Sequence, residues 1–168
     1  MNPPTIEIRT PQRPAEFDAV REIFREYAAS LNIDLCFQGF EQELANLPGD
    51  YAAPRGALLL ALVDGQVAGC CALRPLDNAD YPNACEMKRL YVRPAARGRG
   101  AGRALCQRLL ADATAAGYRM MKLDTEADFA AATGLYRSLG FAEIPRYNDD
   151  PEASTVWMGK VLPMQPGA

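Results

Sequence analysis

Apolar residues recur along the chain at two spacings, and the longer spacing predicts four helices. In the first helix they keep the 3.6-residue period of an amphipathic helix: Phe17, Val20, Ile23, Phe24 and Tyr27. Gly117 and Gly140 follow the last two helices, at the position where a left-handed residue commonly ends a helix. The predicted helices span residues 16–31, 40–47, 100–116 and 130–139.

Continuous apolar runs bounded by turn residues predict the strands. The run 57–63 ends at Asp64-Gly65, a strong hairpin signal, so residues 67–73 are predicted to form its partner strand. The other predicted strands span residues 6–9, 84–92, 119–124 and 154–162, with a short one near Phe141. This order of elements predicts a mixed α/β fold whose sheet begins as a hairpin meander and continues through crossover helices.

The bulk composition narrows the class of protein. The chain has 168 residues, 49% of them apolar, and a formal net charge of −3. We expect one domain over residues 1–168, with a frayed tail at 164–168. No apolar run approaches the ~20 residues of a membrane span, and the first residues show no secretory signal pattern. The slightly acidic balance argues against nucleic acid as a partner, so any anion site must be local.

The cysteines and the missing histidines restrict the chemistry further. Five cysteines without a C-x-x-C pair are typical of small buried thiols in a reducing, cytoplasmic compartment; a reactive thiolate is the alternative. The chain contains no histidine, which excludes Ser-His-Asp and Cys-His catalysis and histidine-based metal sites. We expect no metal. Acid–base chemistry then falls to carboxylates, tyrosine, lysine or cysteine.

One segment, RPAARGRGAGRAL at residues 93–105, places three glycines and four arginines at the junction of a predicted strand and a predicted helix. Free amides and the dipole at a helix start attract anions, and glycines let a phosphate approach the backbone. Neither G-x-G-x-x-G nor G-x-x-x-x-G-K-[ST] is present, so generic dinucleotide or nucleoside-triphosphate binding has no motif support. A solvated basic turn is the alternative.

Two motifs carry a resemblance to a known family. The stretch RLYVRPAARGRGAGRAL resembles motif A of the GCN5-related N-acetyltransferase (GNAT) superfamily, with its core [RQ]-x-x-G-x-[GA], and LYRSLGF at residues 135–141 resembles motif B. The resemblance implies a mostly antiparallel central sheet of six to seven strands flanked by about four helices. It also implies acetyl-CoA as co-substrate. Its diphosphate would lie on the amides of residues 97–102, and its pantetheine arm would pair with residues 90–92. The implied cofactor-binding residues are Leu90, Tyr91, Val92, Arg97, Gly98, Arg99, Gly100, Ala101, Gly102 and Arg103.

The resemblance also suggests an acid and a base. We assign the base that deprotonates the amine to Glu86, on the strand that leads into the glycine–arginine turn. The alternative is a glutamate paired with Lys88 or another cation. Tyr136 matches the family tyrosine that protonates the leaving thiolate, although a core tyrosine on a buried helix face is the alternative. Many members carry asparagine seven residues before this tyrosine; here that residue is Phe129.

The last prediction concerns the acceptor. The family architecture places it beside two loops that mix aromatic and acidic residues, which gives the candidates Asp34, Phe37, Tyr147 and Asp149. Carboxylates there would attract a small amine, although Asp and Asn also favour plain turns. The favoured function is transfer of acetyl to a small-molecule primary amine by direct attack in a ternary complex. A protein or peptide N-acetyltransferase and a non-catalytic acetyl-CoA sensor are the alternatives. A homodimer is compatible with the resemblance.

Overall fold

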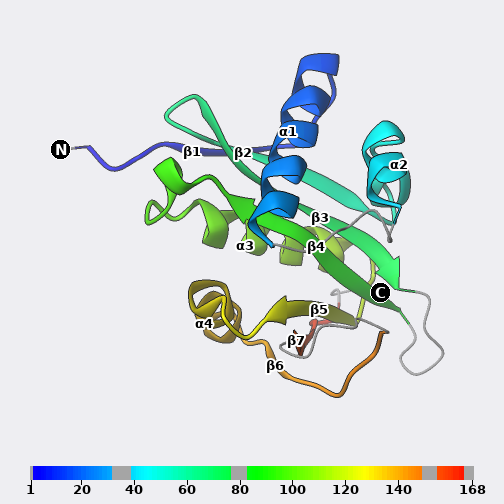
Figure 1. The fold of residues 1–168 in the computed structure, drawn as a ribbon. Coiled ribbons are helices and arrows are strands. Elements are labelled where there is room, and N and C mark those ends of the chain that lie inside the picture. Colours follow the sequence, from blue (N-terminus) through cyan, green and yellow to red (C-terminus); the bar gives the residue numbers. More distant parts are fainter. Residues whose placement is uncertain (1, 32–38, 77–82, 149–154, 165–168) are drawn as a thin grey trace.

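The computed structural model describes residues 2–31, 39–76, 83–148 and 155–164 (Figure 1). Its strands are β1 (Ile6–Arg9), β2 (Ala57–Val63), β3 (Gln66–Leu76), β4 (Ala84–Val92), β5 (Met120–Glu126), β6 (Ala142–Glu143) and β7 (Thr155–Val161). Its α-helices are α1 (Pro14–Ser30), α2 (Phe40–Ala45), α3 (Ala101–Ala115) and α4 (Ala130–Ser138), and the 3-10 turns are η2 (Gly49–Tyr51) and η3 (Pro94–Ala96).

The strands form one seven-stranded sheet in the order β1-β2-β3-β4-β5-β7-β6. Every neighbouring pair is antiparallel except β4 and β5. The predicted hairpin is present: Asp64 and Gly65 both adopt positive φ, at 51° and 81°, as a two-residue hairpin turn requires. The predicted fold class, a mostly antiparallel sheet flanked by four helices, is confirmed among the described residues.

Helices cover both faces of the sheet, and each face has its own apolar core. On one face α3 packs against β2 and β3, and its buried side chains repeat at helical spacing: Ala101, Leu105, Cys106, Leu109 and Ala113. The opposite face carries α1 and α2, seen in blue and cyan in Figure 1. Here Val20, Ile23 and Phe24 of α1 are fully buried. The helical periods of the sequence therefore identified the faces that pack on the sheet.

The parallel pair β4–β5 is incomplete, and this creates an opening in the sheet. Only Ala84, Cys85 and Glu86 of β4 pair with β5, where Glu86 lies opposite Lys122. The remaining residues of β4 pair with β3 alone, and Arg89 forms a bulge there with φ +63°. β5 continues to Glu126, beyond its predicted end at Asp124. The two strands thus part beyond Glu86 and Lys122.

Candidate active site

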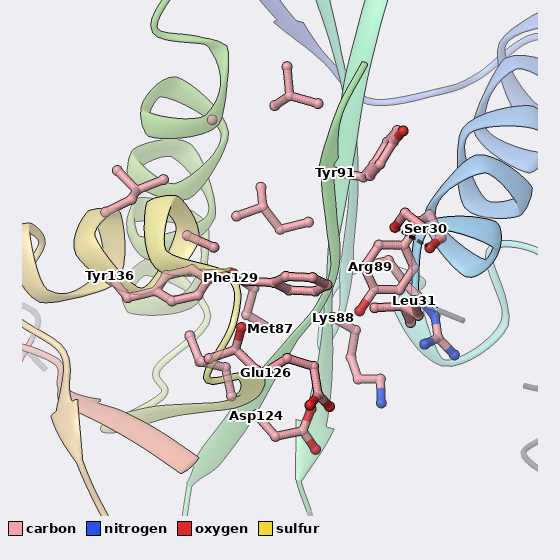
Figure 2. Close-up of a pocket in the computed structure, with 18 of the residues that line it drawn as sticks. Ser30, Leu31, Met87, Lys88, Arg89, Tyr91, Asp124, Glu126, Phe129 and Tyr136 are labelled. Atoms are coloured by element: carbon pink, nitrogen blue, oxygen red, sulfur yellow. Dashed lines mark hydrogen bonds between the residues drawn. The ribbon is translucent and has the colours of Figure 1, made fainter. Parts of the chain in front are cut away.

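A cavity of about 1820 Å³ lies where β4 and β5 part. One end reaches the start of α3. The other end is lined by residues at the end of α1, in α2 and in η2. The N-terminal part of α4 and the end of β5 form a side wall. Figure 2 shows side chains from the end of α1, from β4, from β5 and from α4 around the cavity. Nine of the ten sequence-predicted cofactor residues line it: Leu90, Tyr91, Val92, Arg97, Gly98, Gly100, Ala101, Gly102 and Arg103.

The loop before α3 presents backbone donors to the cavity. Gly98 and Gly100 adopt φ of +80° and +93°, which side chains rarely tolerate. Gly100 is the N-cap of α3, and the first helical bond runs from the Ala104 amide to the Gly100 carbonyl at 3.0 Å. The amides of Ala101, Gly102 and Arg103 have no acceptor among the described residues. These donors at the start of a helix form a site suited to a diphosphate.

The arginines of this segment point in different directions. Arg97 turns back toward β4: its Nε donates to the Val92 carbonyl at 2.9 Å, and its guanidinium lies 5.5 Å from the Tyr91 ring centre. Arg103 donates to Ser138 Oγ at 2.9 Å. Arg99 instead pairs with Asp64 at 3.4 Å and does not line the cavity. Among the predicted cofactor residues, Arg99 is thus the one that the cavity lining does not include.

Tyr136 lines the cavity from α4. Its ring packs edge-on against Phe141, with centroids 5.8 Å apart, and its side chain is buried. Burial raises the pKa of this phenol well above its usual value, so the hydroxyl keeps its proton. No described residue forms a hydrogen bond with that hydroxyl. Tyr136 is therefore a neutral donor facing the cavity.

Phe129, the residue at the family asparagine position, also lines the cavity. It is the N-cap of α4, and its carbonyl accepts hydrogen bonds from the Thr133 amide and the Thr133 hydroxyl, both at 2.9 Å. In Figure 2 its ring lies between Tyr136 and the strand that carries Lys88. An aromatic ring thus stands at this position, and it offers the cavity no side-chain hydrogen bond.

Glu86 is buried but lies behind the cavity wall. One carboxylate oxygen, Oε1, accepts a hydrogen bond from Arg74 Nε at 2.7 Å, and the other, Oε2, accepts one from the Tyr147 hydroxyl at 2.7 Å. Its side chain is 2% exposed and it is not a lining residue. The paired-carboxylate interpretation therefore fits this geometry, with Arg74 rather than Lys88 as the cation.

Tyr147, predicted to bind the acceptor, contacts the sheet instead. Its hydroxyl donates to Glu86, and the centre of its ring lies 5.3 Å from Lys122 Nζ. Burial raises its pKa, and the charge of Glu86 acts in the same direction. Tyr147 is not a lining residue. The other three acceptor candidates, Asp34, Phe37 and Asp149, lie outside the described residues.

Sequence reasoning missed a buried ion pair that connects three elements. Arg89, at the bulge of β4, donates to both carboxylate oxygens of Glu43 on α2, at 3.1 and 3.0 Å. Its guanidinium also lies 5.9 Å from the Tyr27 ring centre and 5.4 Å from that of Phe40. Its side chain is 5% exposed. No motif marks this pair, because its members are 46 residues apart.

Two carboxylates on β5 were also missed as site residues. Asp124 and Glu126 line the cavity from the end of the strand (Figure 2). Asp124 Oδ2 accepts a hydrogen bond from Asn148 Nδ2 at 2.6 Å, and Glu126 Oε1 accepts one from Thr155 Oγ1 at 3.4 Å. The alternation Lys122, Asp124, Glu126 is a readable signal, since strand residues two apart share a face.

Within the described ranges no helix is both long and apolar enough to cross a bilayer. The same residues contain no group of three or more Cys, Asp or Glu side chains that could hold a metal ion.

Comparison with known proteins gives consistent matches. Residues 17–141 match the sequence model of the Acetyltransferase (GNAT) family. An uncharacterized N-acetyltransferase of Schizosaccharomyces pombe is 36% identical over 159 residues, covering 94% of this chain and 96% of that protein. An acetyltransferase of the GNAT family from Staphylococcus aureus has a TM-score of 0.76 at 21% identity, covering 95% of this chain and 100% of that chain. The structure of yncA from Salmonella typhimurium with its cofactor acetyl-CoA has a TM-score of 0.71 at 23% identity, covering 98% of each chain. These solved structures share the fold.

Proposed function

Because the chain belongs to the Acetyltransferase (GNAT) family, we propose that it transfers acetyl from acetyl-CoA to the primary amine of a small molecule by direct attack in a ternary complex. The observation that carries the proposal is the continuity of one cavity. It runs from the amides at the start of α3, which have no acceptor among the described residues, along the side of β4 that does not pair with β5, to the charged residues near α1 and α2. In this proposal the diphosphate would bind at the α3 end of the cavity and the amine acceptor at the end beside α1 and α2.

The residues present fit acetyl-CoA. The amides of residues 101–103 would hold the diphosphate, with Arg97 and Arg103 supplying positive charge at the rim. The backbone of residues 90–92, which does not pair with β5, would pair with the pantetheine amides. When bound, acetyl-CoA supplies an acetyl group activated as a thioester.

Two proton transfers accompany the exchange of the C–S bond for a C–N bond. The incoming ammonium must lose a proton before its nitrogen attacks. We propose that Asp124 accepts this proton, directly or through water, because it lines the cavity, whereas both oxygens of Glu86 already accept hydrogen bonds behind the wall. The departing thiolate must gain a proton, and we propose that it comes from Tyr136, a neutral phenol that lines the cavity from α4.

The test is release of free CoA thiol from acetyl-CoA over a panel of amines, polyamines, amino acids and peptides. We expect turnover with small amines, strongly reduced in Tyr136→Phe. Turnover with peptides alone would overturn the small-molecule acceptor. Thermal shift separates catalysis from binding, because a ligand specific for the folded state raises the melting temperature. A rise with acetyl-CoA but no turnover with any acceptor would favour a sensor, and a rise with nucleic acid alone would overturn the proposal.

A further inference from the structure

The end of the cavity beside α1 and α2, where the acceptor would bind, carries opposite charges on the neighbouring strands β4 and β5. Met87 of β4 and Leu123 of β5 belong to the core beside α3, so the residues that alternate with them face α1 and α2. Lys88 on β4 and Asp124 on β5 are the first such residues beyond the last paired positions, Glu86 and Lys122. Figure 2 shows Lys88 extending along the same side of the cavity as the Asp124 and Glu126 carboxylates.

The other two cations of this end have their own counter-charges. Glu86 pairs with Arg74, and Glu43 pairs with Arg89 through both of its oxygens. Lys88 lines the same cavity, but no described residue forms an ion pair or hydrogen bond with its ammonium. Its burial lowers the pKa of Lys88; Arg89 and Arg74 act in the same direction, while Glu86 and Asp124 oppose it. Among the described residues, Lys88 is therefore a cation without a direct partner in a partly desolvated site.

Arg74 adds donors beside it. Its Nε donates to Glu86, but its two Nη groups have no acceptor among the described residues. Its side chain is 37% exposed and lines the cavity. On the sheet, Arg74 lies opposite Glu86, and Lys88 follows Glu86 on the same face. A guanidinium edge and an ammonium on adjacent strands suit a carboxylate, because charge-assisted hydrogen bonds from both would satisfy it.

A purely cationic acceptor, such as a polyamine, does not suit this arrangement. It would bring positive charge next to Lys88 and leave that ammonium without a partner. An acceptor with a carboxylate as well as an amine would provide a counter-charge for the cations on β3 and β4 and for the carboxylates on β5. Its carboxylate would meet Lys88 and Arg74, and its amino group would lie toward Asp124 and Glu126.

We propose that the acceptor is an amino acid whose carboxylate is bound by Lys88 and Arg74 and whose amino group is acetylated beside Asp124. This inference rests on the proposed acetyl transfer and names the class of its acceptor. Lys88 and Arg74 are thus specificity-determining residues, whereas Asp124 acts on the proton.

The experiment compares each of the twenty L-amino acids with its carboxamide, which keeps the amine and side chain but loses the negative charge. With acetyl-CoA saturating, we expect the preferred amino acid to exceed its carboxamide in kcat/KM by about 10- to 100-fold, the range for charge-assisted hydrogen bonds. Lys88→Met should raise the amino acid KM by a similar factor. The advantage of the amino acid over its carboxamide in kcat/KM should fall by the same factor, because only the amino acid carries the charge that Lys88 binds. Lys160→Met, which removes a lysine outside the cavity, is the matched control and should change none of these values.

The failures of the two proposals are distinguishable. Equal or better turnover of carboxamides or polyamines by the wild type would overturn the amino acid inference and leave acetyl transfer standing. So would a Lys88→Met variant that loses amino acids and carboxamides equally. A protein that shifts its melting temperature with acetyl-CoA but acetylates no amino acid also overturns the inference. A protein that neither binds acetyl-CoA nor releases CoA overturns the proposed function itself.

Discussion

The Tyr147 hydroxyl donates a 2.7 Å hydrogen bond to Glu86, a residue 61 positions earlier in the chain. The second oxygen of Glu86 accepts an equally short bond from Arg74 on the neighbouring strand. One carboxylate thus connects β3, β4 and the segment before β7, directly behind the point where β4 and β5 part. This arrangement gives Glu86 a structural task and holds Arg74 at the edge of the cavity.

Glu86→Gln should lower the free energy of unfolding by about 1.5–3 kcal/mol, the usual range for hydrogen bonds to a charged group. The amide keeps one acceptor oxygen but loses the charge that balances Arg74. Urea denaturation measures the change. The pH–rate profile then identifies the base: the rise of kcat/KM with pH should persist in Glu86→Gln and be lost in Asp124→Asn. The reverse result would return the base role to Glu86.

Tyr136→Phe should lower kcat by about 100-fold, because a positioned general acid contributes at least that much. The acetyl-CoA KM should change little, since the ring and its packing on Phe141 remain. Tyr118→Phe is the matched control. Its hydroxyl donates to the Arg55 carbonyl outside the cavity, so that variant should lose about 1 kcal/mol of stability and keep its kcat. A raised KM with unchanged kcat in Tyr136→Phe would make this tyrosine a binding residue.

Gly100→Ala should impair acetyl-CoA binding, whereas Gly102→Ala should not. Gly100 has φ +93°, so an alanine there costs about 1–3 kcal/mol or rotates the amides at the start of α3. A Cβ on Gly102 would lie 3.5 Å from Leu135 and 3.7 Å from Val92, which are ordinary contacts in a helical position. Calorimetric titration with acetyl-CoA compares the two variants. Equal affinities would contradict the assignment of this loop to the diphosphate.

Arg89→Met should destabilise the protein by about 3–5 kcal/mol, the cost of breaking a buried pair. It leaves Glu43 without its cation and removes the guanidinium from Tyr27 and Phe40. The exposed pair of Arg108 with Asp112 on α3 is the control, and Arg108→Met should cost no more than about 0.5 kcal/mol. Thermal unfolding of both variants measures the difference. Similar losses would mean that burial adds nothing to the Arg89 pair.

The start of α1 should make stability depend on acidic pH. Hydrogen bonds from the Arg13 and Gln12 amides, with smaller contributions from Arg9 and Arg13 side chains, lower the pKa of Glu16 from 4.5 to about 2. A depressed pKa stabilises the fold above pH 4.5, and this contribution is lost as the pH falls toward 2. The melting temperature of Glu16→Gln should therefore vary less with pH across this window than that of the wild type. Parallel curves would show that other groups control the acid transition.

The sequence alone determined those features that depend on residues close together along the chain. Helical and strand periods identified the elements and the faces that pack, as in α3, because amphipathic spacing follows directly from local geometry. The glycine-rich loop before α3 was also readable, because its glycines and the helix that follows are consecutive in the sequence. The end of β5 was missed, because residues 125 and 126 owe their strand conformation to pairing with β7.

Tertiary structure decided which charges share an environment. Glu86 was predicted as a base from its strand, but Arg74 and Tyr147 reach it only after the sheet forms. Arg99 belongs to the predicted motif, yet it pairs with Asp64 of a hairpin distant in sequence and does not line the cavity. In the sequence, Lys88 and Asp124 look like ordinary strand residues. They line a cavity only because β4 and β5 separate next to them in the folded sheet. Local propensity fixes where a side chain lies along its element, whereas its charged neighbours are set by packing between elements far apart in sequence.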